Sequence, residues 1–554
     1  MSAVGPALGQ VLVLLVALVV AVPLLGRYLA HVLGSERHLA VERVSYRLLR
    51  VDPDADQHWR SYTLSVLGFS LVGVLLLLGL GRLQGLLPLS LGLPGLPSDG
   101  AWNTAVSFVT NTNWQWYAGE ATAGHLFQMA GLAVQNFLSA AVGIAVAAAL
   151  ARGLGSDRRD GRVGNFWSDL TRTVVRVLLP LSVVSALLLV ALGAVQGLAG
   201  PGPGTTLTGG SQTVPAGPVA SQEAIKQLGT NGGGFFNANS AHPFENPTPV
   251  SNLLEVFLML VLPFAVAWAF GLLVRDRSQG GAVVAVMALL LTASVGLLTW
   301  AETAGPGTAP RLAGAAMEGK ETRFGEAGSA LFAAVTTGTS TGAVNAAHDS
   351  LTAPGGGVAM FGMMLGEIAP GGVGSGLYGM VLLAVVTVFL AGLMVGRTPE
   401  YLGKKVGQRE VVVVAAYVLT TPVLVLGGIA LAVSLPAGLA GLQESGPHGL
   451  SEALYAVTSA ANNNGSAFAG LTSGTPFWNT LLGMLMLLGR FVPIVLVLAL
   501  AGRFARRPRL PPGAGTLPTH RPLFVVLLAC VALVLVGLTY VPVIVLGPIV
   551  ESLS

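Results

Sequence analysis

Ten apolar runs, each about as long as a membrane-spanning helix, divide this chain of 554 residues. A helix of about 20 apolar residues crosses the hydrocarbon core of a bilayer. Only 10% of the residues are charged, against roughly a quarter in a soluble domain. The sequence therefore predicts an all-α polytopic membrane protein with ten transmembrane helices, and it argues against a soluble enzyme. The runs lie near residues 7–27, 63–83, 126–151, 175–198, 251–274, 281–300, 357–396, 411–435, 477–502 and 522–548.

The basic residues predict which side of the membrane each loop faces. The loops after the odd-numbered runs contain 23 of the 29 Lys and Arg residues. Lys and Arg concentrate in cytoplasmic loops, so both termini are predicted to be extracytoplasmic. No Lys or Arg precedes the first run, which therefore resembles a retained helix more than a secretory signal. The net charge of +4 is a topology signal on this interpretation, and no nucleic-acid partner is expected.

After the first run, the remaining helices pair around four outside loops that contain related segments. Each segment begins half-apolar and continues into a stretch of Thr, Ser, Asn and Gly; the four begin at Ala105, Ala224, Ala330 and Ala453. Ser221 and Ser451 are predicted N-caps of two short helices in these loops. The predicted division is a first helix with its cytoplasmic loop, four repeats and a last helix, at residues 1–60, 61–160, 161–278, 279–409, 410–510 and 511–554.

A short helix followed by an irregular polar stretch is typical of a re-entrant element. Irregular backbone at membrane depth is tolerated only where it is buried in protein or lines a water-filled path. Four such elements around one axis would form a pore whose neck is a ring of backbone carbonyls, which can replace the hydration shell of K⁺. The alternative is four flexible exterior loops, since Asn and Gly are common in turns. The fourfold recurrence after similar helical stretches favours the pore.

The same segments resemble the filter regions of the KdpA family, the potassium-binding subunits of bacterial Kdp potassium-transporting ATPases. The similarity lies in residues 111–115, 229–249, 342–350 and 458–468, and it extends over essentially the whole chain. It implies a four-repeat fold of the superfamily of K⁺ transporters in a bacterial inner membrane. It also implies K⁺ as bound ion and substrate, no covalent cofactor, and a complex with the P-type ATPase subunit KdpB and the small subunits KdpC and KdpF.

The resemblance also implies which residues bind the ion through their backbone carbonyls. They form three rings of four: Asn111, Thr230, Ser340 and Asn463; Thr112, Asn231, Thr341 and Asn464; Asn113, Gly232, Gly342 and Gly465. Asn113 departs from the glycine of the other three repeats, which makes the predicted filter asymmetric at this ring. Gln115 matches a position that the family links to ion affinity.

The seventh run is about twice as long as one spanning helix needs, from Gly355 to Gly396. Pro370, Gly371 and Gly372 lie in its middle and predict a break into two helices joined by a loop at membrane depth. We expect this loop to lie under the filter and restrict passage. A kinked helix with a long external lead-in is the alternative.

Two groups of charged residues have competing interpretations. Arg490 lies within an apolar run, where a charge usually faces a protein interior or a water-filled cavity. The resemblance implies that this arginine blocks the pore below the filter. If the spanning helix instead begins further outside the membrane, Arg490 would lie near the cytoplasmic interface. Arg397, Lys404 and Lys405 suit partner docking or a solvated cytoplasmic loop equally well. Glu367, Asp349 and His348 could attract cations, relay protons or brace loops.

The sequence contains neither a P-loop nor an Asp-Lys-Thr-Gly phosphorylation segment. Uphill transport would therefore require energy from a partner. Three hypotheses follow: the ion-selecting subunit of an ATP-driven uptake complex, a stand-alone K⁺ channel or ion-coupled symporter of the same superfamily, and a membrane scaffold without transport function.

Overall fold

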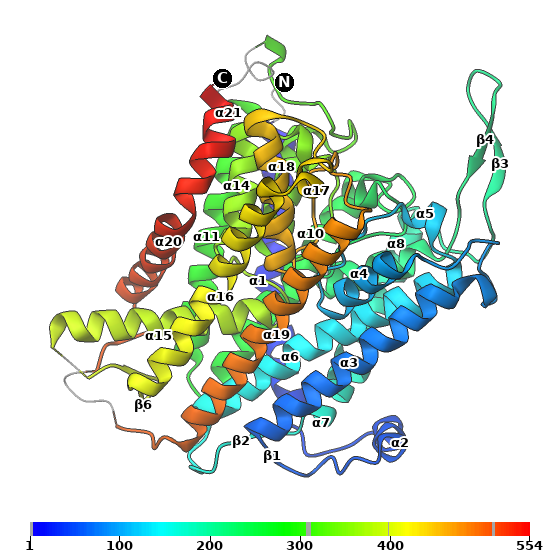
Figure 1. The fold of residues 1–554 in the computed structure, drawn as a ribbon. Helices are drawn as coiled ribbons and strands as arrows, with labels where there is room; N and C mark the ends of the chain where they lie inside the picture. The colour runs from blue at the N-terminus through cyan, green and yellow to red at the C-terminus, as the bar shows by residue number, and fades with distance from the viewer. Residues whose placement is uncertain (1–3, 306–311, 397, 512–515, 554) are drawn as a thin grey trace.

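The computed structural model describes residues 4–305, 312–396, 398–511 and 516–553 as a mostly helical bundle (Figure 1). Ten helical segments of this part of the chain are long and apolar enough to cross a membrane, and they coincide with the ten apolar runs. The predicted fold class is thereby confirmed. The segments are Gly9–Gly34, Trp59–Leu86, Phe127–Gly155, Phe166–Ala191, Pro249–Leu273, Arg277–Thr303, Ser375–Met394, Gln408–Ser434, Pro476–Arg506 and Pro522–Leu553.

The individual elements have the following bounds. The α-helices are α1 (Val4–Gly34), α2 (Ala40–Leu49), α3 (Trp59–Leu83), α4 (Ser98–Val109), α5 (Gly119–Thr122), α6 (Val134–Gly155), α7 (Phe166–Arg172), α8 (Leu179–Ala191), α9 (Val219–Leu228), α10 (Pro249–Leu273), α11 (Arg277–Thr303), α13 (Gly325–Gly338), α14 (Ala353–Met364), α15 (Ser375–Val395), α16 (Gln408–Ser434), α17 (Pro436–Leu439), α18 (Gly446–Ala461), α19 (Pro476–Arg506), α20 (Pro522–Ile544) and α21 (Val550–Leu553). Wider π-turns occur at η2 (Phe127–Ala133), η3 (Thr173–Leu178) and η6 (Val545–Ile549), and 3₁₀ turns at η1 (Gln84–Leu86), η4 (Asn239–Ala241) and η5 (His348–Ser350).

The described residues also form three small antiparallel strand pairs at the ends of the bundle. They are β1 (Gln57–His58) with β2 (Arg162–Gly164), β3 (Gly202–Thr205) with β4 (Ser211–Val214), and β5 (Glu400–Tyr401) with β6 (Lys404–Lys405). Figure 1 marks both chain ends at the same end of the bundle, opposite α2, β2 and β6, and shows the β3–β4 hairpin projecting from the body. The loops predicted to be cytoplasmic therefore lie together at one end.

The centre of the bundle is formed by α6 and α10, whose apolar windows are 83% and 78% buried in protein. Small residues allow their neighbours to approach closely, as is common between membrane helices. A Cβ atom on Gly153 of α6 would lie 2.4 Å from the Ala501 carbonyl oxygen of α19, and one on Gly143 would lie 2.2 Å from the Val373 oxygen. The close packing of α6 positions the site described next.

Both predicted N-caps are wrong. The N-cap of α9 is Pro218 and that of α18 is Ser445. Ser221 lies in the first turn of α9 and Ser451 lies beyond the first turn of α18; their hydroxyls donate to the Pro218 and Pro447 carbonyls at 3.3 and 3.0 Å. The helices begin earlier because Pro447 stands in the first turn of α18 and Pro218 immediately precedes α9, where a missing N–H costs nothing.

Candidate functional site: four helix ends around one axis

Four short helices, α4, α9, α13 and α18, end in the same way. The second residue past each helix has a positive φ: 68° at Asn111, 48° at Thr230, 57° at Ser340 and 58° at Asn463. The N–H of the following residue then bonds back to the last helical turn, from Thr112 to Ser107 (2.9 Å), Asn231 to Lys226 (2.8 Å), Thr341 to Thr336 (3.2 Å) and Asn464 to Ser459 (2.9 Å). This is the Schellman ending, with Asn, Thr or Ser at the left-handed position that glycine usually takes.

The left-handed conformation recurs two residues later in every repeat. The φ angles are 59° at Asn113, 86° at Gly232, 76° at Gly342 and 105° at Gly465. Alternating positive and negative φ turns successive carbonyls toward the same side of a chain, which a regular strand does not do. Asn113 thus shares the backbone conformation of the three glycines, and Asn is one of the few other residue types that tolerate it.

Side-chain hydrogen bonds join three of the four pairs of neighbouring segments. The Asn111 amide donates to the Thr230 carbonyl (2.8 Å), and the Ser340 hydroxyl donates to the Asn463 carbonyl (2.9 Å). The Asn463 amide donates to the Thr112 hydroxyl at 2.9 Å, which connects the fourth repeat to the first.

Close backbone approaches complete the ring between the second and third repeats. A Cβ atom on Gly232 would lie 1.8 Å from the Thr341 carbonyl oxygen, one on Gly342 would lie 2.1 Å from that of Asn464, and one on Gly465 would lie 2.0 Å from that of Thr112. The structure therefore brings all twelve predicted filter residues together around one axis, in the order of the repeats.

Helix α6 supports the first two repeats, a role that the sequence analysis missed. The Asn113 side-chain amide donates to Asn136 Oδ1 at 2.5 Å. One helical turn further, the Ser139 hydroxyl donates to Asn111 Oδ1 (2.7 Å), which also accepts a bond from the Asn231 amide (2.6 Å). Asn136 and Ser139 are polar residues three positions apart in a spanning helix, so they share one face. This spacing is the sequence signal that could have indicated the supporting role of α6.

A buried charge cluster braces the second repeat. The Lys226 ammonium lies 2.6 Å from Glu223 and 2.8 Å from Glu245, and all three side chains are buried. Glu245 also accepts the N–H of Phe236 at 2.8 Å, so the pairing ties α9 to the long loop after the second filter segment. The unusual composition of that loop indicated a special segment, but the burial of Lys226 on α9 was not predicted.

Gln115 lies just outside the ring. Its Oε1 accepts the Gly234 N–H at 2.9 Å, which links the first repeat to the second. Gln115 also lines an outer cavity of about 310 Å³ together with Asn113, Gly342, Gly465 and Trp114. Its predicted influence on affinity would act through this bridge.

The seventh apolar run is broken, as predicted, and the kinked-helix alternative is wrong. Helix α14 ends at Met364 and α15 begins at Ser375, so only α15 has the length of a span. The intervening loop contacts the end of α13 and the first ring. The Gly371 N–H donates to the carbonyl of Gly338, the last residue of α13 (2.8 Å), and the Val373 N–H donates to the hydroxyl of the ring residue Thr230 (2.9 Å). The loop that contains Pro370, Gly371 and Gly372 therefore lies against the first ring; a Cβ atom on Gly372 would lie 3.2 Å from Ser340 Cβ.

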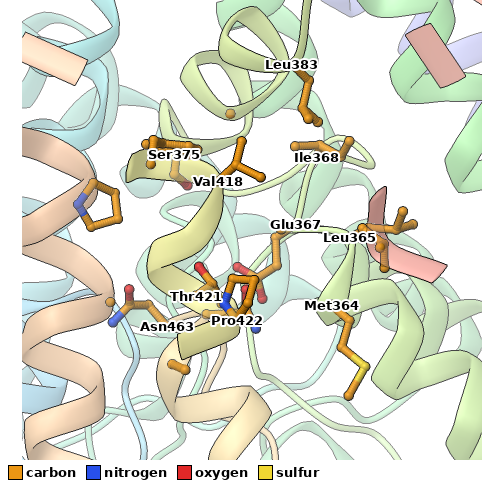
Figure 2. Close-up of a pocket in the computed structure, with 18 of the residues that line it drawn as sticks. Met364, Leu365, Glu367, Ile368, Ser375, Leu383, Val418, Thr421, Pro422 and Asn463 are labelled. Carbon is orange, nitrogen blue, oxygen red and sulfur yellow. The ribbon is translucent and has the colours of Figure 1, made fainter. Parts of the chain in front are cut away.

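A cavity of about 120 Å³ lies beside this loop. Figure 2 shows it between the loop residues Glu367 and Ile368, Thr421 and Pro422 of α16, and Asn463 of the ring. Arg490 of α19 also lines it, is 6% exposed and donates to the Ser139 carbonyl at 3.3 Å. Its place in the middle of Pro476–Arg506 contradicts the interface alternative.

His348, Asp349 and Glu367, the titratable residues near the third repeat, have different surroundings. His348 is buried against the Tyr455 hydroxyl (2.8 Å), and burial together with the charge of Lys320 lowers its pKa to about 4. Asp349 pairs with His448 at 3.0 Å, and hydrogen bonds to Asp349 and Glu551 raise the pKa of His448 to about 10. These two residues brace loops, whereas Glu367 lines the cavity.

The predicted docking residues do not form one exposed group. Lys404 is fully buried, and its ammonium donates to the Ser156 carbonyl and to that of Arg507, the latter at 2.6 Å. It neutralises carbonyls at the ends of α6 and α19, so the docking role of Lys404 is corrected to a structural one. Lys405 is exposed, and Arg397 lies outside the described residues.

Comparison with known proteins identifies the family. The family model described as "KdpA: Potassium-transporting ATPase A subunit" matches residues 11–553. The chain belongs to the KdpA family. Among relatives, the potassium-transporting ATPase potassium-binding subunit of Kineococcus radiotolerans is 62% identical over 98% of this chain and 97% of its own length. The subunit of the same name from Clavibacter sepedonicus is 59% identical over 98% of both chains.

The fold of this KdpA-family chain also has a more distant structural neighbour. The crystal structure of the potassium transporter TrkH from Vibrio parahaemolyticus superposes with a TM-score of 0.51. The superposition covers 78% of this chain and 85% of TrkH at 18% identity, and it therefore concerns the fold alone.

Proposed function

We propose that this chain binds and selects extracytoplasmic K⁺ in a bacterial inner membrane and passes it to a P-type ATPase subunit for high-affinity uptake. The ring of twelve filter residues carries the proposal. The repeated alternation of positive and negative φ would turn carbonyl oxygens toward a common axis, and such oxygens replace the hydration shell of K⁺. The four helices end at the ring, so the negative ends of their dipoles favour a cation there.

The ATPase partner is proposed from what the sequence lacks and from the relatives. The sequence contains neither a P-loop nor an Asp-Lys-Thr-Gly phosphorylation segment. The relatives are named as potassium-binding subunits of a potassium-transporting ATPase. KdpB supplies the hydrolysis on this proposal, with KdpC and KdpF as further subunits. The chain itself contributes no catalytic residue; both its termini are extracytoplasmic, and its four repeats follow the division 61–160, 161–278, 279–409 and 410–510.

Co-purification of the chain with its partner subunits tests this function. The ATPase activity of the complex is measured while K⁺ or Na⁺ is titrated. We expect K⁺ to stimulate hydrolysis at concentrations at least about tenfold below those of Na⁺, the equivalent of about 1.4 kcal/mol of discrimination. Stimulation indifferent to K⁺ would overturn the proposal. Uptake by vesicles that contain the chain alone, without partner or ATP, would favour the stand-alone channel or symporter.

Arg490 and the loop at Pro370–Gly372 are proposed to prevent straight passage from the filter to the cytoplasm. Arg490 reaches the α6 backbone from α19 across the space below the ring. We expect Arg490→Ala to permit passive K⁺ flux through the chain in vesicles, because the substitution removes both the charge and most of the side chain. Arg490→Lys is the matched variant and should retain most of the barrier. Flux as low as in the unsubstituted protein would contradict the blocking role.

A further inference from the structure

Helix α2 lies between the first two spans, and its surface has three faces of different character. One face packs against the protein: Glu42 and Tyr46 are buried, and the Glu42 carboxylate holds the Arg176 guanidinium at 2.5 Å. This pairing lowers the pKa of Glu42 despite the opposing effect of burial. Helix α2 is therefore packed against the bundle through this face.

The other two faces of α2 point away from the protein. Val41, Val44 and Leu48 are 61%, 54% and 80% exposed, and their spacing of three and four residues places them in one stripe. Arg43 and Arg47 lie four residues apart on a second face, and Arg50, the residue that caps the end of α2, follows them; all three are exposed. A helix with separate basic and apolar faces is the usual form of an interfacial membrane helix.

The contacts of α2 place it at the level where the spans leave the bilayer. Its partner Arg176 belongs to η3 within the span Phe166–Ala191, and the Arg176 carbonyl accepts a bond from the Tyr28 hydroxyl of α1 at 2.8 Å. Trp167 lies in the first turn of that span, and Trp59 begins α3. Tyr and Trp concentrate at membrane–water interfaces. Figure 1 shows α2 nearly end-on at the lower right of the bundle, so its axis runs across those of the neighbouring helices.

We propose that α2 is an interfacial helix that inserts Val41, Val44 and Leu48 into the cytoplasmic leaflet and binds anionic phospholipid headgroups through Arg43, Arg47 and Arg50. The arginines complement the negative surface of that leaflet, and guanidinium groups pair well with phosphate. The insertion covers apolar side chains that would otherwise face water. This inference is independent of the filter and of the proposed transport function.

Spin labels on the full chain, assembled with its partner subunits in nanodiscs of phosphatidylcholine and phosphatidylglycerol, test the insertion. The one cysteine, Cys530, is first changed to Ser, and a single label is then attached at Leu48→Cys. Leu419→Cys on α16 serves as the lipid reference and Leu207→Cys in the β3–β4 turn as the water reference; these side chains are 59% and 109% exposed.

The measurement compares collisions of each label with oxygen, which concentrates in lipid, and with a water-soluble nickel chelate. We expect the label at residue 48 to match that at 419, with oxygen collisions several-fold above those with nickel. A label at 48 that matches the one at 207 would overturn the proposal, and so would a label shielded from both reagents, since a protein partner would then cover this face.

The choice of headgroup has its own test. Arg47→Gln/Arg50→Gln is expected to weaken the retention of spin-labelled phosphatidylglycerol by the complex several-fold, while retention of phosphatidylcholine stays the same. Arg158→Gln is the control, because Arg158 lies in another predicted cytoplasmic loop, where it pairs with Asp56 at 2.7 Å. Equal retention in the double variant and the unsubstituted protein would overturn the anionic-lipid assignment.

Discussion

Gly232→Ala is expected to raise the K⁺ concentration for half-maximal ATPase stimulation of the complex by at least about 100-fold, the equivalent of about 2.7 kcal/mol. Gly232 has a φ of 86°, and its added Cβ would lie 1.8 Å from the Thr341 carbonyl oxygen. The left-handed backbone alone costs a residue with a Cβ about 1–2 kcal/mol. The clash cannot be relieved by a side-chain rotation, because the neighbour is the backbone of the adjacent filter segment.

Gly296→Ala provides the matched control for this prediction. Gly296 lies inside α11, and no atom outside its local helix lies within 4 Å of where its Cβ would be. This substitution should leave the K⁺ titration unchanged and favour the helix slightly. If Gly232→Ala titrated like Gly296→Ala while the complex assembled normally, the filter assignment of the second repeat would be wrong.

Asn136→Ala is expected to raise the same half-maximal K⁺ concentration by about tenfold, since losing the partner of a buried polar group costs about 1–3 kcal/mol. Asn136 lies on α6 and accepts the hydrogen bond of the Asn113 side chain. Asn113 must keep a φ of 59° without being glycine, and the hydrogen bond restrains its side chain while it does so. The K⁺ titration of the purified complex measures the effect.

A double variant separates this positioning role from general damage to α6. Asn113→Gly provides the left-handed conformation without a side chain to restrain, so Asn136→Ala should have little further effect on the K⁺ titration in that background. An effect of Asn136→Ala that remained undiminished in the Asn113→Gly background would show that Asn136 does not act through Asn113. Ser182→Ala, at a buried serine of α8, controls for the removal of a polar side chain from a span.

The architecture was largely predictable from the sequence because its main signals are local. Ten apolar runs are visible as runs, and Pro370 with its glycines breaks the seventh wherever it lies. The fourfold helix endings were also visible, since Asn, Thr, Ser and Gly are the residues that accept such backbone angles. The first residues of the short helices were harder to predict. Ser221 resembles an N-cap, but Pro218 is the N-cap of α9 and the helix begins at Val219.

The contacts that close the ring could not be predicted in this way, because they join residues that are 119 to 351 positions apart. Asn463 and Thr112, for example, are 351 residues apart. The buried position of Lys404 has the same cause, since its acceptors are on α6 and near the end of α19. In a basic loop, the composition alone does not distinguish a lysine that caps helix ends from one that faces solvent.

The closed ring also has a consequence for the synthesis of the protein. The ring segment of the first repeat, near Asn111, reaches the membrane before Gly465 and helix α19 have been synthesised. Until then, the exposed carbonyls and amides of the early segments have no neighbouring segment to pair with, and lipid cannot satisfy them. Truncated chains that end before residue 446 should therefore be recognised by quality-control proteases even though most of their spans are inserted. On the proposed function, the ion site would be complete only after the fourth repeat has joined the other three.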